Sequence, residues 1–191
     1  MAKTPSDPPK RRYRSRGSSM DALRASAMEL LLTHHPEHIT IRDIAELADV
    51  AHVYIPQYFG GKAELFADIY PTAAVEAASA VAWPPLSATE IKPELLRLAR
   101  LALWLAANHP GGVSAGPRPV VSRLPDVLTE QYQLDEHTAY LLTERLIALV
   151  TIFAGAPTAV SPDPIDLAAH IDLEVRILAA LANESAQDSS T

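Results

Sequence analysis

The apolar residues of this chain recur at helical spacing along most of its length, and no long stretch alternates with period two. Residues three or four positions apart share one face of a helix, so this spacing predicts helices and not strands. Gly, Pro and His residues separate the periodic segments. The pattern predicts an all-α fold with helices at about residues 18–33, 41–48, 51–59, 62–82, 92–108, 126–133, 135–154 and 165–183.

Several of the expected connections depend on Gly and Pro. Gly60-Gly61 permits a sharp turn after the helix at 51–59. The long helix at 62–82 is expected to end at Trp83-Pro84-Pro85, and the next helix is expected to begin near Ala88. Residues 111–125 contain three Gly and three Pro, which predicts a loop with at most short helices.

Residues 39–66, ITIRDIAELADVAHVYIPQYFGGKAELF, have the layout of a helix-turn-helix. Thr40 followed by Asp43 matches a capping box, in which the two side chains satisfy free amide groups at a helix start. Apolar residues then follow at helical spacing until Asp49 ends the first helix. The second helix, at 51–59, carries mostly polar and aromatic side chains. In a helix-turn-helix, this second helix enters the major groove of DNA.

The same stretch resembles the DNA-binding domain of the tetracycline-repressor-like (TetR-like) family of bacterial regulators. The family pattern is met by Thr40, Ile41, Asp43, Ile44, Ala45, Ala48, Val50, Ile55, Tyr58, Phe59, Lys62 and Leu65. The resemblance implies an N-terminal three-helix DNA-binding domain and a C-terminal helical domain that binds a ligand and dimerises. The expected divisions are a disordered basic arm at 1–17, the DNA-binding domain at 18–64, the regulatory and dimerisation domain at 65–183 and a flexible tail at 184–191.

Three residues depart from the family pattern. Asp49 replaces the usual Gly of the turn, and Asp is one of the few residues that tolerate a left-handed backbone. Ala51 replaces the usual Ser, which removes a capping hydrogen bond worth ~1 kcal/mol. Pro56 lies inside the expected recognition helix, where a proline costs ~3 kcal/mol. We therefore expect this helix to be kinked or loosened near Ile55 and Pro56.

Composition places the chain among globular proteins. It has 191 residues, enough for one large or two small domains, with 48% hydrophobic and 20% charged residues. The absence of Cys excludes disulfides, thiolate metal sites and Cys nucleophiles. No apolar run has the length of a membrane span or follows the basic N-terminus as in a signal peptide. We therefore expect a cytoplasmic protein with no membrane partner.

The net charge of −7 would by itself argue against a nucleic-acid-binding protein, but the charge is unevenly distributed along the chain. Residues 1–62 hold nine Lys or Arg and seven Asp or Glu, whereas the remainder hold seven and 16. A basic end on an acidic body is expected where only that end meets DNA phosphate. Arg14 and Arg16, which we expect to precede the first helix, are candidates for this contact. The alternative is that the arm only keeps the protein soluble.

Four residues are expected to position the domain on the DNA backbone. Arg42 and Lys62 lie near helix starts, where the chain approaches phosphate. Thr40 could add a hydrogen bond from its hydroxyl or its backbone amide. The resemblance implies a further phosphate contact for Tyr58.

Three other residues are expected to face the bases. Gln57 can pair with adenine through two hydrogen bonds, while His52 and Tyr54 can contact base edges, thymine methyls or phosphate. The alternative for Tyr54 is burial against the following long helix. Val53 could contact a thymine methyl or only pack.

The last two helices carry apolar faces wider than one core requires. The residues expected at a dimer interface are Ile147, Thr151, Ile152, Ile165, Ala168, Ile171, Val175 and Leu178. The resemblance implies a four-helix bundle across a two-fold axis, and a two-fold dimer requires a roughly palindromic operator. The alternative is that these helices complete the core of one chain.

The resemblance also implies a small-molecule effector bound beneath the long helix that begins near residue 62. Residues with polar tips or aromatic rings that could line such a pocket are Trp83, Trp104, His109, Arg118, Arg123, Tyr132, His137, Tyr140 and Phe153. Each of the aromatic residues could instead be core, and each Arg could be solvated. The segment at 110–125 is the expected ligand entrance.

The sequence gives little support to other classes of function. Gly60-Gly61-Lys62 lacks the upstream glycine and the strand of a phosphate-binding loop, and no Ser lies in a nucleophile elbow. His34, His35 and His38 are interpreted as a polar connector and not as a metal site. We therefore expect a ligand-responsive DNA-binding regulator, with repression implied only by the family resemblance, and with no catalytic residues and no cofactor. The alternatives are a helical interaction module and a DNA-binding protein without an effector.

Overall fold

The structure is a computed structural model that describes residues 15–81, 92–113 and 118–155, together with 169–174, 176, 177, 180 and 183. Its helices are α1 (Arg16–Thr33), the 3-10 helix η1 (Pro36–His38), α2 (Ile41–Leu47), α3 (Tyr54–Phe59), α4 (Lys62–Val81), α5 (Pro93–Asn108), α6 (Pro119–Tyr132) and α7 (Glu136–Gly155). The described residues between 169 and 183 are also helical. The prediction of an all-α fold is confirmed, since the described part of the chain contains no strand.

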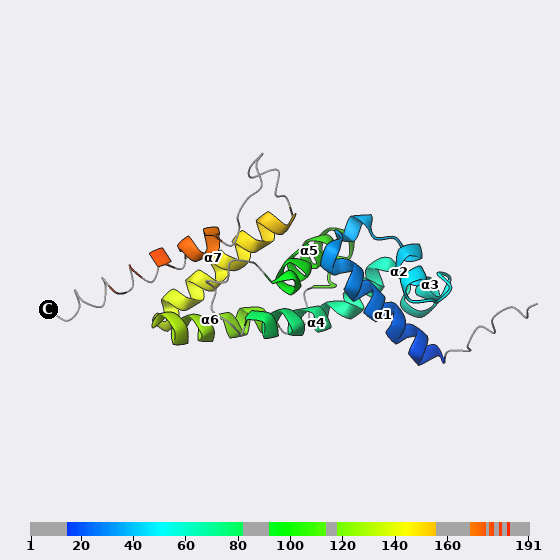
Figure 1. The fold of residues 1–191 in the computed structure, drawn as a ribbon, viewed down its shortest axis with the longest axis horizontal. Helices are drawn as coiled ribbons and strands as arrows, with labels where there is room; N and C mark the ends of the chain where they lie inside the picture. The colour runs from blue at the N-terminus through cyan, green and yellow to red at the C-terminus, as the bar shows by residue number, and fades with distance from the viewer. Residues whose placement is uncertain are drawn as a thin grey trace, which may run out of the picture.

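The helices form an elongated molecule with α1, α2 and α3 at one end (Figure 1). Helices α6 and α7 lie toward the other end, and α4 and α5 lie between the two. Helix α5 packs against α1 and α4 and also against α7, while α4 packs against α6. The two central helices therefore connect the two ends of the molecule.

One hydrophobic core joins the three N-terminal helices to α4 and α5. Its fully buried side chains include Leu23 of α1, Ile44 of α2, Ile55 of α3, Phe66 of α4 and Leu105 of α5. The expected domain boundary after residue 64 falls within this core, because the first turns of α4 pack directly beneath the small helices. Helices α4 and α5 are therefore in direct contact with the three N-terminal helices.

A second core lies between α6 and α7. It contains Leu128 and Leu142, which are almost completely buried, and it also buries Ile171. The sequence pattern predicts Ile171 at a dimer interface, but its side chain packs inside one chain with 7% exposure. For this residue the burial favours the alternative that these helices complete the core of one chain, because apolar periodicity alone does not say which apolar face of a helix meets its own chain.

Helix α1 begins earlier than the sequence predicts. Its first residue is Arg16, and the side chain of Ser15 caps it by accepting a hydrogen bond from the amide of Ser18 at 3.2 Å. Arg16 therefore lies in the first turn of α1 and does not precede the helix. Serine at this position satisfies one of the free amides at a helix start, which explains why the helix extends to it.

Helix α6 is also longer than the sequence indicates. The Gly and Pro content predicts a loop up to residue 125, but the helix starts at Pro119, in the first helical position. A proline there loses nothing, because the first amides of a helix have no intrahelical partner. Pro125 lies inside the helix, where Leu124 and Leu128 pack into the second core and hold the turn. Helix α5 similarly begins at Pro93 and not near Ala88.

Some of the expected features lie outside the described residues. They are the first 14 residues of the arm with Arg14, the tail at 184–191, the candidate ligand residue Trp83, and the candidate interface residues Ile165, Ala168, Val175 and Leu178.

Candidate nucleic-acid interface

The turn between α2 and α3 is built by the local interactions that the sequence indicates. Thr40 accepts a hydrogen bond from the amide of Asp43 at 3.2 Å, and the carboxylate of Asp43 accepts one from the amide of Thr40 at 2.7 Å. The two bonds form the predicted capping box, and the hydrogen bond from the Thr40 amide lowers the pKa of the Asp43 carboxyl. Asp49 has the left-handed backbone expected of it, with φ of 52°. The amide of Val50 then donates to the carbonyl of Ala45 at 2.9 Å, which closes the turn.

Helix α3 is shorter than expected, and this changes the role of Pro56. The helix begins at Tyr54 and not at Ala51, after a turn in which the amide of Tyr54 donates to the carbonyl of Ala51 at 3.0 Å. Pro56 is consequently the third helical residue. The carbonyl of His52, to which an amide at position 56 would donate, instead accepts from Ile55 at 3.2 Å. The expected interior kink is therefore wrong, because a proline in the first turn costs no helical hydrogen bond.

This placement predicts that Pro56→Ala lowers the stability slightly instead of raising it. A proline whose backbone is compatible with its site restricts the unfolded chain and stabilises by about 0.4–1 kcal/mol. We expect the free energy of unfolding, measured in urea, to fall by that amount in Pro56→Ala. In contrast, Pro71→Ala should raise the free energy of unfolding, because Pro71 lies inside α4. A clear gain in stability for Pro56→Ala would contradict the placement in the first turn.

Helix α3 is anchored by one side and exposed on the other. Ile55 is fully buried in the first core, whereas His52, Val53 and Gln57 are exposed. Val53 is 53% exposed, which excludes the alternative that it packs within this chain. The first turn of α3 and the turn before it therefore present an accessible face of polar and apolar side chains.

Two tyrosines form a platform along this face. Tyr54 and Tyr58 stack with their ring centroids 5.0 Å apart, and the guanidinium of Arg16 lies 5.1 Å from the centre of the Tyr58 ring. Tyr54 is 36% exposed, so it is not buried against α4 as the alternative requires. Arg16 thus places a cation against one ring of the stacked pair at the edge of α3, where the ring face attracts it.

Of the residues expected to contact phosphate, Thr40 and Arg42 are exposed at the start of α2, whereas Lys62 is half-buried. Lys62, at the start of α4, folds back so that its ammonium lies 5.0 Å from the Trp104 ring centre and 5.5 Å from that of Phe66. Burial lowers the pKa of Lys62, and the carboxylates of Glu37 and Asp43 oppose that change.

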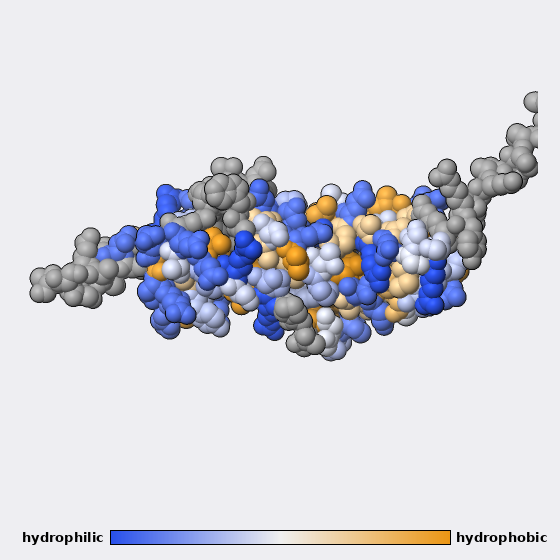
Figure 2. Space-filling view, turned by 90° about the horizontal axis from the view of Figure 1, so that it is seen from below, coloured by the Kyte–Doolittle hydropathy of each residue, from blue (hydrophilic) through white to orange (hydrophobic). Residues whose placement is uncertain are grey.

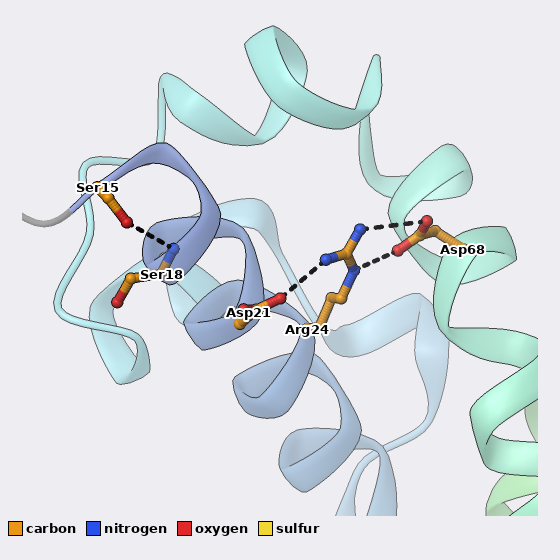
Figure 3. A network of polar contacts seen from close by, with 5 residues as sticks. All are labelled: Ser15, Ser18, Asp21, Arg24 and Asp68. Atoms are coloured by element: carbon orange, nitrogen blue, oxygen red, sulfur yellow. Dashed lines mark hydrogen bonds and ion pairs between the residues drawn. The ribbon is translucent and has the colours of Figure 1, made fainter.

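Arg24 is a residue of this region that the sequence pattern does not reveal. Its Nε donates to Asp68 of α4 at 2.6 Å, and its Nη1 donates to Asp21 at 3.0 Å (Figure 3). Its guanidinium also lies 5.3 Å from the ring centre of Phe59, the last residue of α3. One side chain thus joins α1, α3 and α4. Helical periodicity cannot identify such a residue, because two of its partners, Phe59 and Asp68, lie far along the chain.

The candidate ligand residues that the structure describes do not meet at one place. Trp104 packs on the first core and Tyr132 on the second, while Phe153 lies 6.0 Å from the ring of His170. His109, which ends α5, is half-buried beside Gly112. Exposed at the surface are Arg118, Arg123, His137 and Tyr140. No group of three residues able to hold a metal ion occurs among the described residues.

Helix α7 and the helix that follows it expose apolar side chains. Ile152 is 54% exposed, Leu141 47%, Leu173 50% and Ile177 47%, whereas Ile147 and Thr151 are half-buried. Within the described residues, Glu136–Ala154 has the length and hydropathy of a membrane span, with 28% of it buried. On the face drawn in Figure 2, hydrophobic side chains interrupt the hydrophilic surface at several places along the molecule.

Comparison with known proteins identifies the architecture. No family model matches the chain, and no curated protein matches it. A TetR-family transcriptional regulator from Streptomyces coelicolor is 18% identical, and the match covers 91% of this chain and 84% of the other with a TM-score of 0.50. The protein therefore has the fold of TetR-type regulators.

Two further solved structures are similar over most of their length. The TetR-family repressor AlkX from Dietzia sp. strain DQ12-45-1b, implicated in biodegradation of n-alkanes, is 18% identical, covering 91% of this chain and 97% of its own with a TM-score of 0.43. The fatty acid degradation regulator FadR from Bacillus halodurans is 16% identical, covering 83% and 97% with a TM-score of 0.44.

Proposed function

We propose that the protein is a transcription regulator that binds double-stranded DNA through α3. The observation that carries the proposal is the exposed face formed by His52, Val53, Tyr54 and Gln57, which a single buried residue, Ile55, anchors to the core. The capping box at the start of α2 and the left-handed turn at Asp49 hold this face in the geometry of a helix-turn-helix. Arg42 and Arg16 supply cations beside it for phosphate.

Binding as a homodimer is part of the same proposal. Leu141 and Ile152 lie eleven residues apart on α7, which returns them to one face of the helix, and Leu173 and Ile177 form a second exposed pair. A two-fold axis through these faces would build a four-helix bundle and set two copies of α3 on a palindromic site. Exposed Glu144 and Arg145 in the middle of α7 favour this use of the helix over a membrane span, because charges are costly in lipid.

The regulatory part of the proposal is a small-molecule effector acting on a cytoplasmic repressor. Its support is the arrangement of α4 and α5, which connect both cores and so can transmit a displacement from one to the other. Allosteric couplings of about 1–3 kcal/mol are enough to change DNA affinity by 5- to 150-fold. The protein is proposed to act by binding alone, without a cofactor or catalytic residues.

Gln57→Ala tests the DNA-binding proposal. Fluorescence anisotropy with the intergenic DNA upstream of the gene should give saturable binding that weakens steeply with salt. We expect the variant to lose about 5- to 100-fold in affinity for the preferred duplex, because a bidentate base contact is removed, and little for an unrelated duplex. The double variant Gln57→Ala/Tyr58→Ala should bind the preferred duplex more weakly still.

The matched control is Glu130→Ala, an exposed substitution on α6 at the far end of the molecule. It should bind both duplexes as the wild type does. Equal binding of the wild type and Gln57→Ala to every duplex would exclude Gln57 as a residue that reads the bases. No binding to any duplex would favour a helical interaction module.

A further inference from the structure

Lys62 occupies a position from which it could serve either DNA or the protein itself. It is the first residue of α4 and follows α3 by only Gly60 and Gly61. This link is only two residues long, and Gly60 has φ of 104°, a backbone conformation that residues with side chains rarely adopt. Lys62 therefore lies directly beside the end of α3.

The structure places the Lys62 ammonium against two aromatic rings. Its Nζ lies 5.0 Å from the ring centre of Trp104 and 5.5 Å from that of Phe66, and these rings meet edge to face at 5.2 Å. The ring faces attract a cation, and the attraction strengthens where water is excluded. Lys62 is half-buried, and burial lowers its pKa, while Glu37 and Asp43 from η1 and α2 favour its charged form.

Trp104 connects this contact to the rest of the molecule. It lies on α5 between Leu101 and Leu105, which are fully buried in the first core. The same helix packs against α7, which belongs to the second core. A shift of α5 relative to α4 would therefore separate Trp104 from Lys62 directly beside the end of the recognition helix.

We propose that Lys62 is a positioning residue that couples α5 to the recognition helix through Trp104, and that it contributes to DNA binding by this contact and not by neutralising a phosphate. The inference rests on the proposed DNA-binding function. It assigns to Trp104 a role in coupling the two ends of the protein in place of ligand binding.

The salt dependence of DNA binding separates the two roles of Lys62. Removing one cation that neutralises a phosphate reduces the slope of log affinity against log salt concentration by about 0.9, because fewer counterions are released. We expect Lys62→Met to bind the preferred duplex about 3- to 30-fold more weakly, with the slope unchanged. Trp104→Leu should weaken binding to a similar degree, and the double variant should bind no more weakly than either single one.

Two further variants make the comparison decisive. Arg42→Met removes an exposed cation at the start of α2 and is expected to reduce the salt slope by about 0.9 for each phosphate that this arginine neutralises. Lys62→Arg retains a cation above the rings and should recover most of the affinity. A reduced slope for Lys62→Met, together with wild-type binding by Trp104→Leu, would overturn the inference and make Lys62 a phosphate-binding residue.

A second measurement does not depend on DNA. The same four proteins, wild type, Lys62→Met, Trp104→Leu and the double variant, can be compared by urea unfolding at a fixed protein concentration. Non-additive stabilities are expected if the two side chains interact, and additive ones would contradict the contact itself. A wild type that binds no duplex would instead overturn the proposed function, whatever the outcome of this cycle.

Discussion

Ile152→Asp is expected to convert the protein into a folded monomer that binds a palindromic duplex at least about 100-fold more weakly. Ile152 is 54% exposed on α7, so the substitution leaves the core of one chain intact. In the proposed four-helix bundle, however, it would bury a carboxylate without a partner. Loss of the dimer removes the gain of two linked half-sites, which is about 10²- to 10⁴-fold.

Analytical ultracentrifugation and fluorescence anisotropy on the same samples measure both effects. Val75→Asp is the matched control, because Val75 is a similarly exposed apolar residue, 58% exposed on α4. It should leave the mass and the DNA affinity unchanged. Should Ile152→Asp remain a dimer with wild-type affinity, the interface would have to lie on another face of the molecule.

Glu76→Ala is expected to destabilise the protein by about 3 kcal/mol, although the side chain it removes is 47% exposed. Its carboxylate is the ion-pair partner of Arg97, whose side chain is 3% exposed on α5. Among the described residues, the other hydrogen-bond partner of this guanidinium is the carbonyl of Met28 on α1, at 3.4 Å. Without Glu76, a buried cation would remain with too little compensation.

Arg97→Met should behave in the opposite way. It removes the buried charge and keeps an unbranched side chain, while the freed Glu76 carboxylate can be hydrated. Replacing a buried charge by an apolar side chain is commonly neutral or stabilising, so we expect a change of no more than about 1 kcal/mol in the free energy of unfolding. Within the described part of the chain, Nε of Arg97 has no hydrogen-bond partner, which adds to the cost of keeping the charge.

Urea unfolding followed by circular dichroism checks this ordering. Glu29→Ala, at an exposed position on α1, is the control and should change the stability by less than about 0.5 kcal/mol. If Arg97→Met proved as damaging as Glu76→Ala, the ion pair itself would stabilise the packing of α1, α4 and α5, and the desolvation argument would not hold.

The local features of the helix-turn-helix could be predicted because they depend on neighbouring residues. The capping box needs only Thr40 and Asp43, and the end of α3 needs only a glycine with a left-handed backbone at Gly60. The turn at Asp49 likewise follows from the tolerance of Asp for positive φ. Each of these features lies within a few residues of its cause, so the amino-acid sequence carries it.

The roles of individual charged and aromatic residues could not be predicted in the same way. Arg24 joins three helices, and the partners of Arg97 come from α1 and α4. The sequence suggests Trp104 as a ligand-binding residue, but it packs on Phe66 and Lys62. An apolar or cationic side chain can be satisfied in several ways, and the packing of distant helices selects among them.

The chain alone determined that the protein is helical, where most helices end, and that residues 39–66 form a helix-turn-helix, since these depend on periodicity, capping and turn residues. Tertiary structure decided the rest. Pro56 removes no helical hydrogen bond, because α3 starts only after the turn at 51–54 and Pro56 lies in its first turn. Residues 119–125 became helical because Leu124 is buried in the second core, and Ile171 turned inward for the same reason. For residues 119–125 and Ile171, the burial of apolar surface against another helix outweighed the local preference.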